Sequence, residues 1–342
     1  MSSTTLTKTF NLPGKDRIFD YLAGEQIHQT FGRFIKILLI PVIAMFIFLG
    51  LWSVGAKNVE TSLGVLPGPA KVWEQTVGLY NEHLAEREKE VAFKERMQKR
   101  IDKAIAANKP QEKIEKMQNR NYTGKETFFD QILTSLWTVM AGFIVASLIA
   151  IPIGVACGMS TTLYNAFNPL IQIFKPVSPL AWLPLVTMVV SALYVSDNPL
   201  FAKSFLTSAI TVTLCCLWPT IINTTVGVNG VDKDLINVSR VLRLNSLTKT
   251  FKIVLPSAIP MIFTGLRLSL SIGWMVLIAA EMLAQNPGLG KFVWDEFQNG
   301  SSNSLARIMV AVLVIGMIGF LLDRGMLMLQ RMVSWDKNAV LR

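Results

Sequence analysis

Few residues in this sequence have the types and spacing that catalysis requires. A phosphate-binding loop of the form Gly-x-x-x-x-Gly-Lys-Ser/Thr surrounds phosphates with backbone amides and a lysine. The nearest match is Gly288-Leu289-Gly290-Lys291, but Gln285 replaces the first glycine and Phe292 follows the lysine. The sequence also has no His-Glu-x-x-His, Gly-x-Ser-x-Gly or paired Cys-x-x-Cys motif. We therefore expect no ATPase site and no other active site in this chain.

The cysteines and histidines do not form a metal-binding or disulfide pattern. Cys157, Cys215 and Cys216 lie inside apolar runs, which is typical of small core residues. His28 and His83 lie in polar segments and are too few to build a metal site. We expect neither a metal nor a disulfide framework.

Charge is scarce and unevenly distributed along the 342 residues. Charged residues make up 16% of the chain, against about a quarter in soluble domains. No charged residue occurs in 131–174 or in 204–231. Membrane-spanning helices need about 20 consecutive apolar residues, and soluble domains lack charge-free stretches of this length. The composition excludes a disordered chain, a disulfide scaffold and an ordinary cytoplasmic enzyme, and it predicts an all-α polytopic membrane protein.

The apolar runs predict six membrane spans. We expect these spans at about 34–54, 131–158, 166–195, 201–226, 258–283 and 304–330. The third run contains Pro169, Pro176, Pro179 and Pro184. It cannot be one straight helix, because each proline removes a helical hydrogen bond and clashes with the preceding turn. The polar segment 1–33 precedes the first span, so we expect an interfacial segment there and no signal peptide.

An even number of spans places both termini on one side of the membrane. The segments 1–33, 227–257 and 331–342 would share that side, and each has more Lys and Arg than Asp and Glu. Cytoplasmic segments are enriched in Lys and Arg, so we expect both termini in the cytoplasm and attribute the net charge of +10 to this bias, not to nucleic-acid binding. The connection 55–130 would then be periplasmic. Long loops cross the membrane largely regardless of their charge.

The periplasmic connection contains a charged insertion at 84–126. It holds 12 Lys and Arg and 8 Asp and Glu. Its possible i,i+4 ion pairs are Glu90 with Lys94, Glu95 with Lys99, and Glu112 with Lys116. The sequence Asn108-Lys109-Pro110 interrupts the pattern, so we expect a helix–turn–helix. Either a docking surface for an external partner or a solvated spacer fits this composition.

The cytoplasmic loop 227–257 is unusually well organised. Asp234 can serve as an N-cap, and apolar residues follow at the spacing of an amphipathic helix. A second short helix is expected to reach Leu255 and to stop at Pro256. Two short amphipathic helices at a membrane surface can dock into a partner's groove. The alternative is that they lie on lipid.

This loop resembles the coupling loop of ABC importer permeases. The family pattern is Glu-Ala-Ala, three residues, Gly, nine residues, then Ile-x-Leu-Pro. Asn237-Val238-Ser239 stands at the first triplet, Arg243 at the glycine, and Ile253-Val254-Leu255-Pro256 closes the pattern at the matching distance. Glycine permits a left-handed turn between the short helices, so Arg243 implies either a turn with negative φ or a strained left-handed arginine.

Further stretches resemble the nitrate/bicarbonate/sulfonate (taurine) branch of these permeases. They are 63–73, 168–170, 174–185, 263–267, 279–283 and 288–290. The segments 292–296 and 318–324 resemble nitrate and bicarbonate permeases more than taurine permeases, and the chain as a whole looks closest to nitrate permeases. The resemblance covers about 34–82 and 128–333 and leaves the insertion 84–126 outside.

The resemblance implies a six-span type I ABC importer transmembrane domain with its core at 131–330. Two permeases, expected to be identical copies, would line one pathway in the bacterial inner membrane. ATP-binding subunits would hydrolyse ATP with Mg, and a periplasmic substrate-binding protein would deliver a small oxyanion. This chain would bind no cofactor itself. The residues implied in coupling to the ATP-binding subunits are Asp234, Asn237, Ser239, Arg240, Arg243, Ile253, Leu255 and Pro256.

Three of the ionisable residues inside predicted spans are candidates for a structural or functional role. Such groups cost roughly 2.5–3.5 kcal/mol each to insert, so they usually pair or line water. We expect Arg267 to form a structural ion pair with Asp323, a role that we favour over contact of Arg267 with the anion. Glu281 would repel an anion, so we expect it to act as a gate or to contact the binding protein.

Aromatic and proline residues near helix breaks are further pathway candidates. Trp182 and Trp274 can line the pathway, although packing in the core is the interpretation that we favour for each. Pro184 is expected to shape a broken helix, which is tolerated at membrane depth only where it is buried or faces a cavity.

Nitrate or nitrite is the first choice of substrate, ahead of bicarbonate and then sulfonates such as taurine. An ion-coupled secondary transporter is a second hypothesis, but it would need acidic or histidine relays that the spans lack beyond the three ionisable residues above. A membrane enzyme is the third hypothesis, and no nucleophile–base pattern supports it.

Overall fold

The computed structural model describes residues 39–61, 64–107, 110–120, 122–195, 200–301 and 303–333. The chain divides into two compact units, Met1–Ala70 and Lys71–Arg342, which are described separately below. The expected interfacial segment 1–33 and the tail after residue 333 lie outside the described residues.

The first unit contains one long apolar helix. Helix α3 (Ile40–Lys57) carries Pro41 in its first turn, where the missing N–H costs no helical hydrogen bond. It is long and apolar enough to cross a membrane. The expected span began at residue 34, and residues 34–38 are outside the described part. A short antiparallel pair, β1 (Glu60–Thr61) and β2 (Gly64–Val65), follows the helix.

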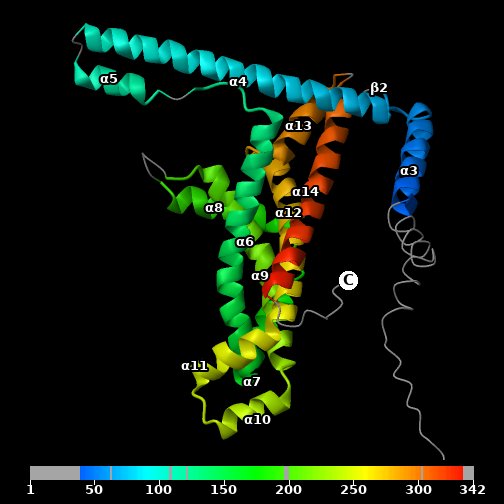
Figure 1. Ribbon diagram of the computed structural model, residues 1–342, viewed down its shortest axis with the longest axis vertical. Coiled ribbons are helices and arrows are strands. Elements are labelled where there is room, and N and C mark those ends of the chain that lie inside the picture. Colours follow the sequence, from blue (N-terminus) through cyan, green and yellow to red (C-terminus); the bar gives the residue numbers. More distant parts are fainter. Residues whose placement is uncertain are drawn as a thin grey trace, which may run out of the picture. The chain divides into compact units, whose positions relative to one another are not determined.

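The second unit is built from helices. In chain order these are α4 (Pro69–Ala106), α5 (Gln111–Gln118), α6 (Phe128–Met159), α7 (Thr161–Phe174), α8 (Pro179–Leu193), α9 (Lys203–Asn229), α10 (Lys233–Val241), α11 (Ser246–Lys249), the π-helical turn η2 (Thr250–Val254), α12 (Leu255–Ala284), α13 (Leu289–Asn299) and α14 (Ser304–Val333). Helices α6, α9 and α12 run side by side through the centre of this unit, and α14 lies along α12 (Figure 1).

The central helices approach closely because small residues lie where they cross. A side chain at Gly154 of α6 would place its Cβ 2.6 Å from Cβ of Thr224 on α9. Thr225 of α9 also donates a hydrogen bond to the Gly154 carbonyl oxygen at 3.2 Å. Membrane helices lack a hydrophobic drive to associate with one another, so close backbone packing and such hydrogen bonds hold them together.

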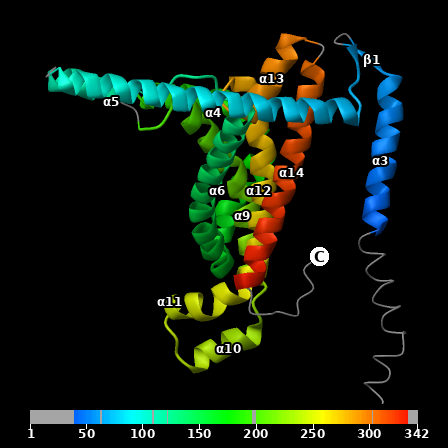
Figure 2. The same cartoon turned by 45° about the horizontal axis from the view of Figure 1, so that its top comes forward.

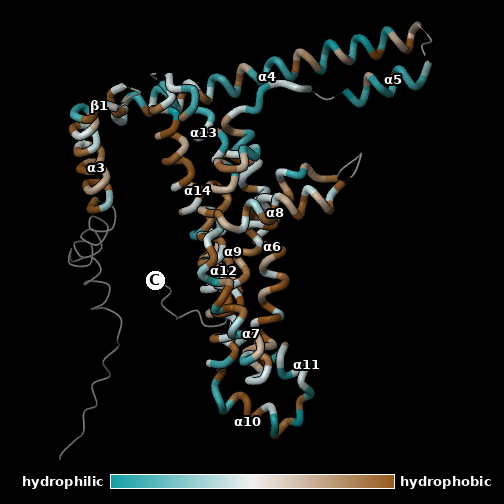
Figure 3. The backbone as a smooth tube through the Cα atoms, turned by 180° about the vertical axis from the view of Figure 1, so that it is seen from behind, coloured by the Kyte–Doolittle hydropathy of each residue, from teal (hydrophilic) through white to brown (hydrophobic). Residues whose placement is uncertain are grey.

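Membrane-spanning helices account for most of the apolar sequence. Five described helical segments are long and apolar enough to cross a membrane, with Ser246–Ala284 counted as one. The pair α7 and α8 adds a sixth span if it is counted as one, and it bends by 99° at its break. The prediction that the third apolar run is not a straight helix is therefore confirmed. Figure 3 shows the apolar colouring along the spans and the hydrophilic colouring of much of α4 and α5.

Two helical groups mark opposite ends of the second unit. Helices α10 and α11 lie at one end of the bundle, and α4 and α13 lie at the other (Figures 1 and 2). The loop that contains α10 and α11 and the charged insertion that begins in α4 thus lie at opposite ends of the long helices.

The insertion is helical, with α4 and α5 on either side of the expected break. Lys94 pairs with Glu90 at 2.7 Å and Lys116 pairs with Glu112 at 2.6 Å. The third predicted pair, Glu95 with Lys99, does not form in the described insertion. Exposed ion pairs of this kind stabilise a helix by only a few tenths of a kcal/mol each. They support the helical conformation of α4 and α5 but do not hold these helices against the rest of the unit.

Candidate functional site

The loop between α9 and α12 begins with a capped amphipathic helix. The side chain of Asp232 accepts a hydrogen bond from the Asp234 backbone N–H at 2.9 Å, so Asp232 is the N-cap of α10. The expectation that Asp234 caps this helix is wrong by two residues. Asp234 lies in the first turn, where its negative charge interacts favourably with the positive end of the helix dipole.

Helix α10 presents an apolar face to its surroundings. The side chains of Leu235, Val238, Val241 and Leu242 are exposed. Ser239, one turn after Leu235, is buried, and its hydroxyl donates to the Ile236 carbonyl oxygen at 2.6 Å. An exposed apolar helix face of this kind can fill a groove on a partner.

Arg243 makes the turn that ends α10. Its φ angle is 47°, in the left-handed region. The Leu244 N–H donates to the Ser239 carbonyl oxygen and the Arg243 N–H donates to the Arg240 carbonyl oxygen, each at 3.0 Å. These two bonds define a Schellman motif, in which the left-handed position is usually glycine. The second of the two expected alternatives, a strained left-handed arginine, is therefore the one observed.

The helix that begins after Asn245 does not end at Pro256. Asn245 caps α11 through a 2.7 Å bond from the Thr248 N–H, and the helix then continues through η2 into α12. The expectation that Pro256 ends a separate short helix is wrong. The π-helical turn before the proline widens the helix, which accommodates the ring and the missing N–H. Ile253 and Leu255 lie at this junction, and Val254 between them is buried.

Glu281 lies at the other end of α12, where α6, α12 and α13 meet. Its side chain is only 1% exposed. The Ser135 hydroxyl lies 2.8 and 2.9 Å from its two carboxylate oxygens, and the Gly290 N–H donates to it at 3.0 Å. A carboxylate at the first turn of α13 is favoured by the dipole of that helix. In this structure the Glu281 carboxylate is enclosed by the chain itself, and its expected role as a gate or as a contact for the binding protein stays a prediction.

The structure brings Arg267 and Asp323 together. The Arg267 Nε donates to one oxygen of Asp323 at 3.0 Å and a terminal nitrogen donates to the other at 3.1 Å. Both side chains are partly buried, so the pair links α12 to α14.

The aromatic candidates separate into two environments. Trp274 is 5% exposed, and its Nε1 donates to the Ile315 carbonyl oxygen at 3.0 Å, as a residue packed in the core does. Trp182 is half-buried and lines a cavity of about 390 Å³ at the bend between α7 and α8. Pro184 is exposed on α8.

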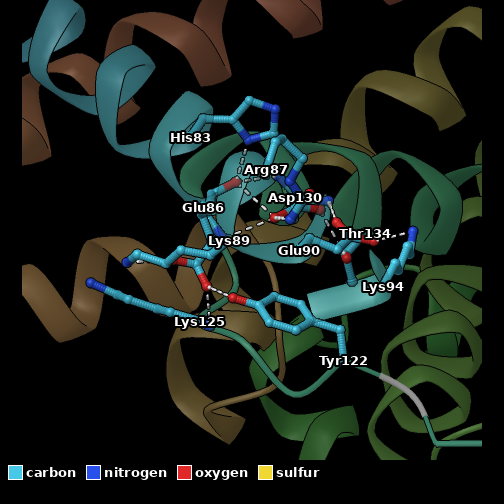
Figure 4. Close-up of polar contacts among 11 residues, drawn as sticks. His83, Glu86, Arg87, Lys89, Glu90, Lys94, Tyr122, Lys125, Asp130 and Thr134 are labelled. Carbon is cyan, nitrogen blue, oxygen red and sulfur yellow. Dashed lines mark hydrogen bonds and ion pairs between the residues drawn. The ribbon is translucent and has the colours of Figure 1, made fainter. Parts of the chain in front are cut away.

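Sequence reasoning missed the attachment of α4 to the bundle. His83 Nδ1 lies 2.7 Å from Thr127 Oγ1, and Arg87 donates to Asp130 at 3.1 Å (Figure 4). Arg307 of α14 pairs with Glu82 of α4 and with Glu296 of α13. The contacts that involve α4 join residues at least 43 positions apart in the chain, so no local pattern could have indicated them.

Glu86 of α4 accepts hydrogen bonds from the segment 122–127, which follows α5. The Tyr122 hydroxyl donates to the Glu86 carboxylate at 2.7 Å and the Lys125 backbone N–H donates to it at 3.1 Å (Figure 4). The hydrogen bond from Tyr122, together with that from Lys89, lowers the pKa of Glu86 below its ordinary value. The same hydrogen bond raises the pKa of Tyr122.

Sequence reasoning also passed over Lys175, which lies at the bend and lines the same cavity as Trp182. The available signal was its isolation, since it is the one charged residue between Asp130 and Asp197.

In the described part of the chain, no three His, Cys, Asp or Glu side chains cluster as metal ligands would.

Comparisons with known proteins agree with this geometry. Residues 150–334 match the family described as binding-protein-dependent transport system inner membrane component. The nitrate import permease protein of Synechocystis sp. is 37% identical over 203 residues, which are 59% of this chain and 69% of that protein. The bicarbonate transport system permease protein of the same organism is 39% identical over 207 residues, covering 60% and 69% of the two chains.

A solved structure shares the fold. An inward-facing structure of the MetNI methionine ABC transporter aligns with a TM-score of 0.52 at 14% identity, covering 60% of this chain and 96% of that one. At this identity the likeness establishes the arrangement of the helices.

Proposed function

The chain belongs to the family of binding-protein-dependent transport system inner membrane components, and from this premise we propose that it is the permease subunit of an ATP-driven importer of a small oxyanion. Nitrate is the leading substrate. Bicarbonate and sulfonates such as taurine are the alternatives within the same class. The observation that carries the proposal is the loop 233–255, in which an exposed amphipathic helix joins a span without a break.

This loop has the mechanical properties that coupling requires. The exposed apolar face of α10 can enter a groove on an ATP-binding subunit. The Schellman turn at Arg243 fixes the angle between α10 and α11. Because α11, η2 and α12 form one continuous helix, a rigid-body movement of the partner would shift α12 and switch the pathway between two packings.

Asp234, Asn237, Ser239, Arg240, Arg243, Ile253, Leu255 and Pro256 remain our proposed coupling residues. Their roles divide in two. Those on α10 and its turn contact the partner or set the angle of the loop, and those at the junction with α12 carry the movement into the membrane.

The partners follow from the same proposal. ATP and Mg would bind to separate ATP-binding subunits, so the chain itself would not be an enzyme. A periplasmic binding protein would deliver the anion, and a second, identical permease would complete the pathway. The orientation in the bacterial inner membrane would place both termini and the coupling loop in the cytoplasm, in accord with their excess of Lys and Arg.

The segments 292–296 and 318–324 favour an inorganic anion, nitrate or bicarbonate, over a sulfonate, and nitrate is preferred because the chain as a whole looks closest to nitrate permeases. The relatives above support the two inorganic anions about equally, because the identities are 37% and 39%. A self-sufficient ion-coupled transporter is less well supported, since Asp323 is paired with Arg267 and the partners of Glu281 in the described structure, Ser135 and Gly290, include no second carboxylate that would form a relay.

The proposal can be tested with the complete complex in liposomes. The permease would be purified with its ATP-binding subunits, and the binding protein would be added after loading with nitrate, bicarbonate or taurine. We expect nitrate-loaded protein to stimulate both ATP hydrolysis and uptake of labelled nitrate. Stimulation only by binding protein loaded with bicarbonate or taurine would identify that anion as the substrate in place of nitrate. Absence of nucleotide dependence, with no ATP-binding subunit retained during purification, would overturn the importer.

A further inference from the structure

Lys175 is an isolated positive charge between the two halves of the bent apolar pair α7 and α8. It is the one charged residue in the 66 positions from 131 to 196. It follows α7 directly and precedes α8, so it lies at the 99° bend of the broken span. A lone ammonium group at membrane depth costs roughly 2.5–3.5 kcal/mol on insertion scales, and such residues usually mark ion or substrate paths.

The bend opens onto a cavity beside the middle of α9 and α12. The cavity has a volume of about 390 Å³, and Lys175 lines it together with Ser178 and Trp182. The opposite wall comes from the middle of α9, at Cys215–Asn223, and from Leu268 and Ile272 in the middle of α12. A space of this size can hold a small anion together with water.

The lining of the cavity favours an anion. The described residues that line it include no Asp or Glu. Trp218 contributes an indole Nε1–H that is buried without a hydrogen-bond acceptor in the described structure. Helix α8 begins beside the cavity, and its N-terminus adds a partial positive charge. Asn223 donates its amide to the Pro219 carbonyl oxygen at 2.8 Å, which holds its side chain in place.

Two other basic residues lie near this level of the helices. Arg324, next to Asp323 on α14, lies over the Phe320 ring at 5.0 Å from its centroid. Arg267 precedes Leu268 on α12, but its guanidinium makes two hydrogen bonds to Asp323. Lys175 forms no ion pair with any described residue, and its side chain is exposed. Lys175 is therefore the positively charged residue that lines the cavity, and no described carboxylate pairs with it.

We propose that Lys175, with the cavity at the α7–α8 bend, is a binding place for a small oxyanion on its way through the membrane. The ammonium group would attract the anion, and Trp218 Nε1–H would donate a hydrogen bond to it. Binding through one flexible lysine is strong enough to draw the anion in and weak enough to release it. This inference rests on the proposed function, since it concerns the path of the transported anion.

The test compares charge-removing and charge-keeping variants in the complete complex. We expect Lys175→Gln to lower nitrate uptake by about tenfold or more, which corresponds to about 1.4 kcal/mol, while stimulation of ATP hydrolysis by the loaded binding protein stays within about twofold. Lys175→Arg should keep at least half of the uptake. Trp218→Phe removes the indole N–H but keeps an aromatic ring that can stack on Phe174, and it should lower uptake severalfold. Lys203→Gln, at the start of α9, is the matched control and should leave uptake unchanged.

A chemical variant separates charge from folding. Lys175→Cys would be made with Cys157, Cys215 and Cys216 replaced by alanine, because Cys215 lines the same cavity. A thiol reagent that attaches an ammonium group should restore uptake, and a neutral reagent of the same length should not. Equal restoration by both reagents would overturn the proposal.

The outcomes are distinguishable from failure of the importer itself. A wild-type complex that imports none of the anions overturns the proposed function and the anion site together. Normal uptake by Lys175→Gln overturns the anion site alone. If the permease no longer forms a dimer in Lys175→Gln, and if neither reagent restores uptake in Lys175→Cys, Lys175 belongs to the contact between subunits. That outcome would also overturn the anion site.

Discussion

Arg267 of α12 and Asp323 of α14 face each other in a two-pronged ion pair, 56 residues apart in the chain. A guanidinium and a carboxylate match each other in a two-point hydrogen-bonded pair, and pairing offsets the cost of placing either charge inside a membrane. The pair thus fixes the spacing of two spans and leaves no free charge behind.

Breaking this pair should destabilise the permease. Arg267→Ala and Asp323→Ala each strand one charge, at a cost of about 3 kcal/mol, and we expect a lower unfolding temperature and loss of uptake. The exchange Arg267→Asp with Asp323→Arg should recover part of both. Thermal unfolding of the purified complex measures the effect. If the exchanged double variant is no better than the single variants, the pair is not the reason for their defects.

The junction of α12 and α13 should not tolerate a methyl group at Gly290. A Cβ at this position would collide with the Ile278 carbonyl oxygen and would displace the N–H that donates to Glu281. We expect Gly290→Ala to lower the free energy of unfolding by about 1–3 kcal/mol. Gly78→Ala is the matched control, because nothing lies within 4 Å of its added Cβ. This change in α4 should stabilise the helix by up to about 1 kcal/mol, and equal losses in both variants would contradict the packing argument.

The contact between Tyr122 and Glu86 should hold the segment 122–127 over a wide pH window. The pKa of Glu86 is lowered, so its contribution is present above the ordinary glutamate pKa and is lost as pH falls through the lowered value. The pKa of Tyr122 is raised, so its contribution is present below the ordinary tyrosine pKa and is lost as pH rises through the raised value.

Mobility of a spin label at Thr123→Cys, with the native cysteines replaced, measures this window. We expect low mobility between the two limits and higher mobility at both extremes. Glu86→Gln should raise mobility throughout and remove the acid limb of the profile. A transition centred near neutral pH would argue that another group controls the segment.

The turn at Arg243 should be improved by the residue that the family uses. Arg243→Gly removes the left-handed strain of a side chain with φ of 47°, which is worth about 1–2 kcal/mol, without altering the two Schellman hydrogen bonds. We expect a higher unfolding temperature and unchanged coupling of ATP hydrolysis to uptake. A drop in coupling would show instead that the Arg243 side chain contacts the ATP-binding subunit.

Adding length to the same loop should have the opposite effect. Residues inserted between Arg243 and Asn245 separate α10 from the continuous helix that begins at α11. We expect ATP hydrolysis to persist while uptake is lost, measured together in liposomes. An insertion of the same length between α4 and α5, far from this loop, is the control and should leave the ratio of uptake to hydrolysis unchanged. Normal uptake with the loop insertion would exclude a coupling role for the loop.

Much of the architecture follows from local properties of the chain. Charge-free runs predict spans, because a span needs only enough consecutive apolar residues to cross the bilayer. The prolines between residues 169 and 184 predict the bend of α7 and α8, and Asn108-Lys109-Pro110 predicts the break between α4 and α5. The coupling-loop resemblance likewise depends on spacing within a few dozen residues, so it could be read without knowing how the helices pack.

The polar contacts inside the bundle depended on tertiary structure. Ser135 reaches Glu281 across 146 residues, and the acceptor of Trp274 is the Ile315 carbonyl oxygen on another helix. Pro256 looks like a helix stop by local rules, yet a π-helical turn and the buried Val254 carry the helix past it. Periodicity and composition determine which segments are helical and apolar. Which side chains meet depends on how those helices pack, and that is decided by close contacts between residues far apart in the sequence.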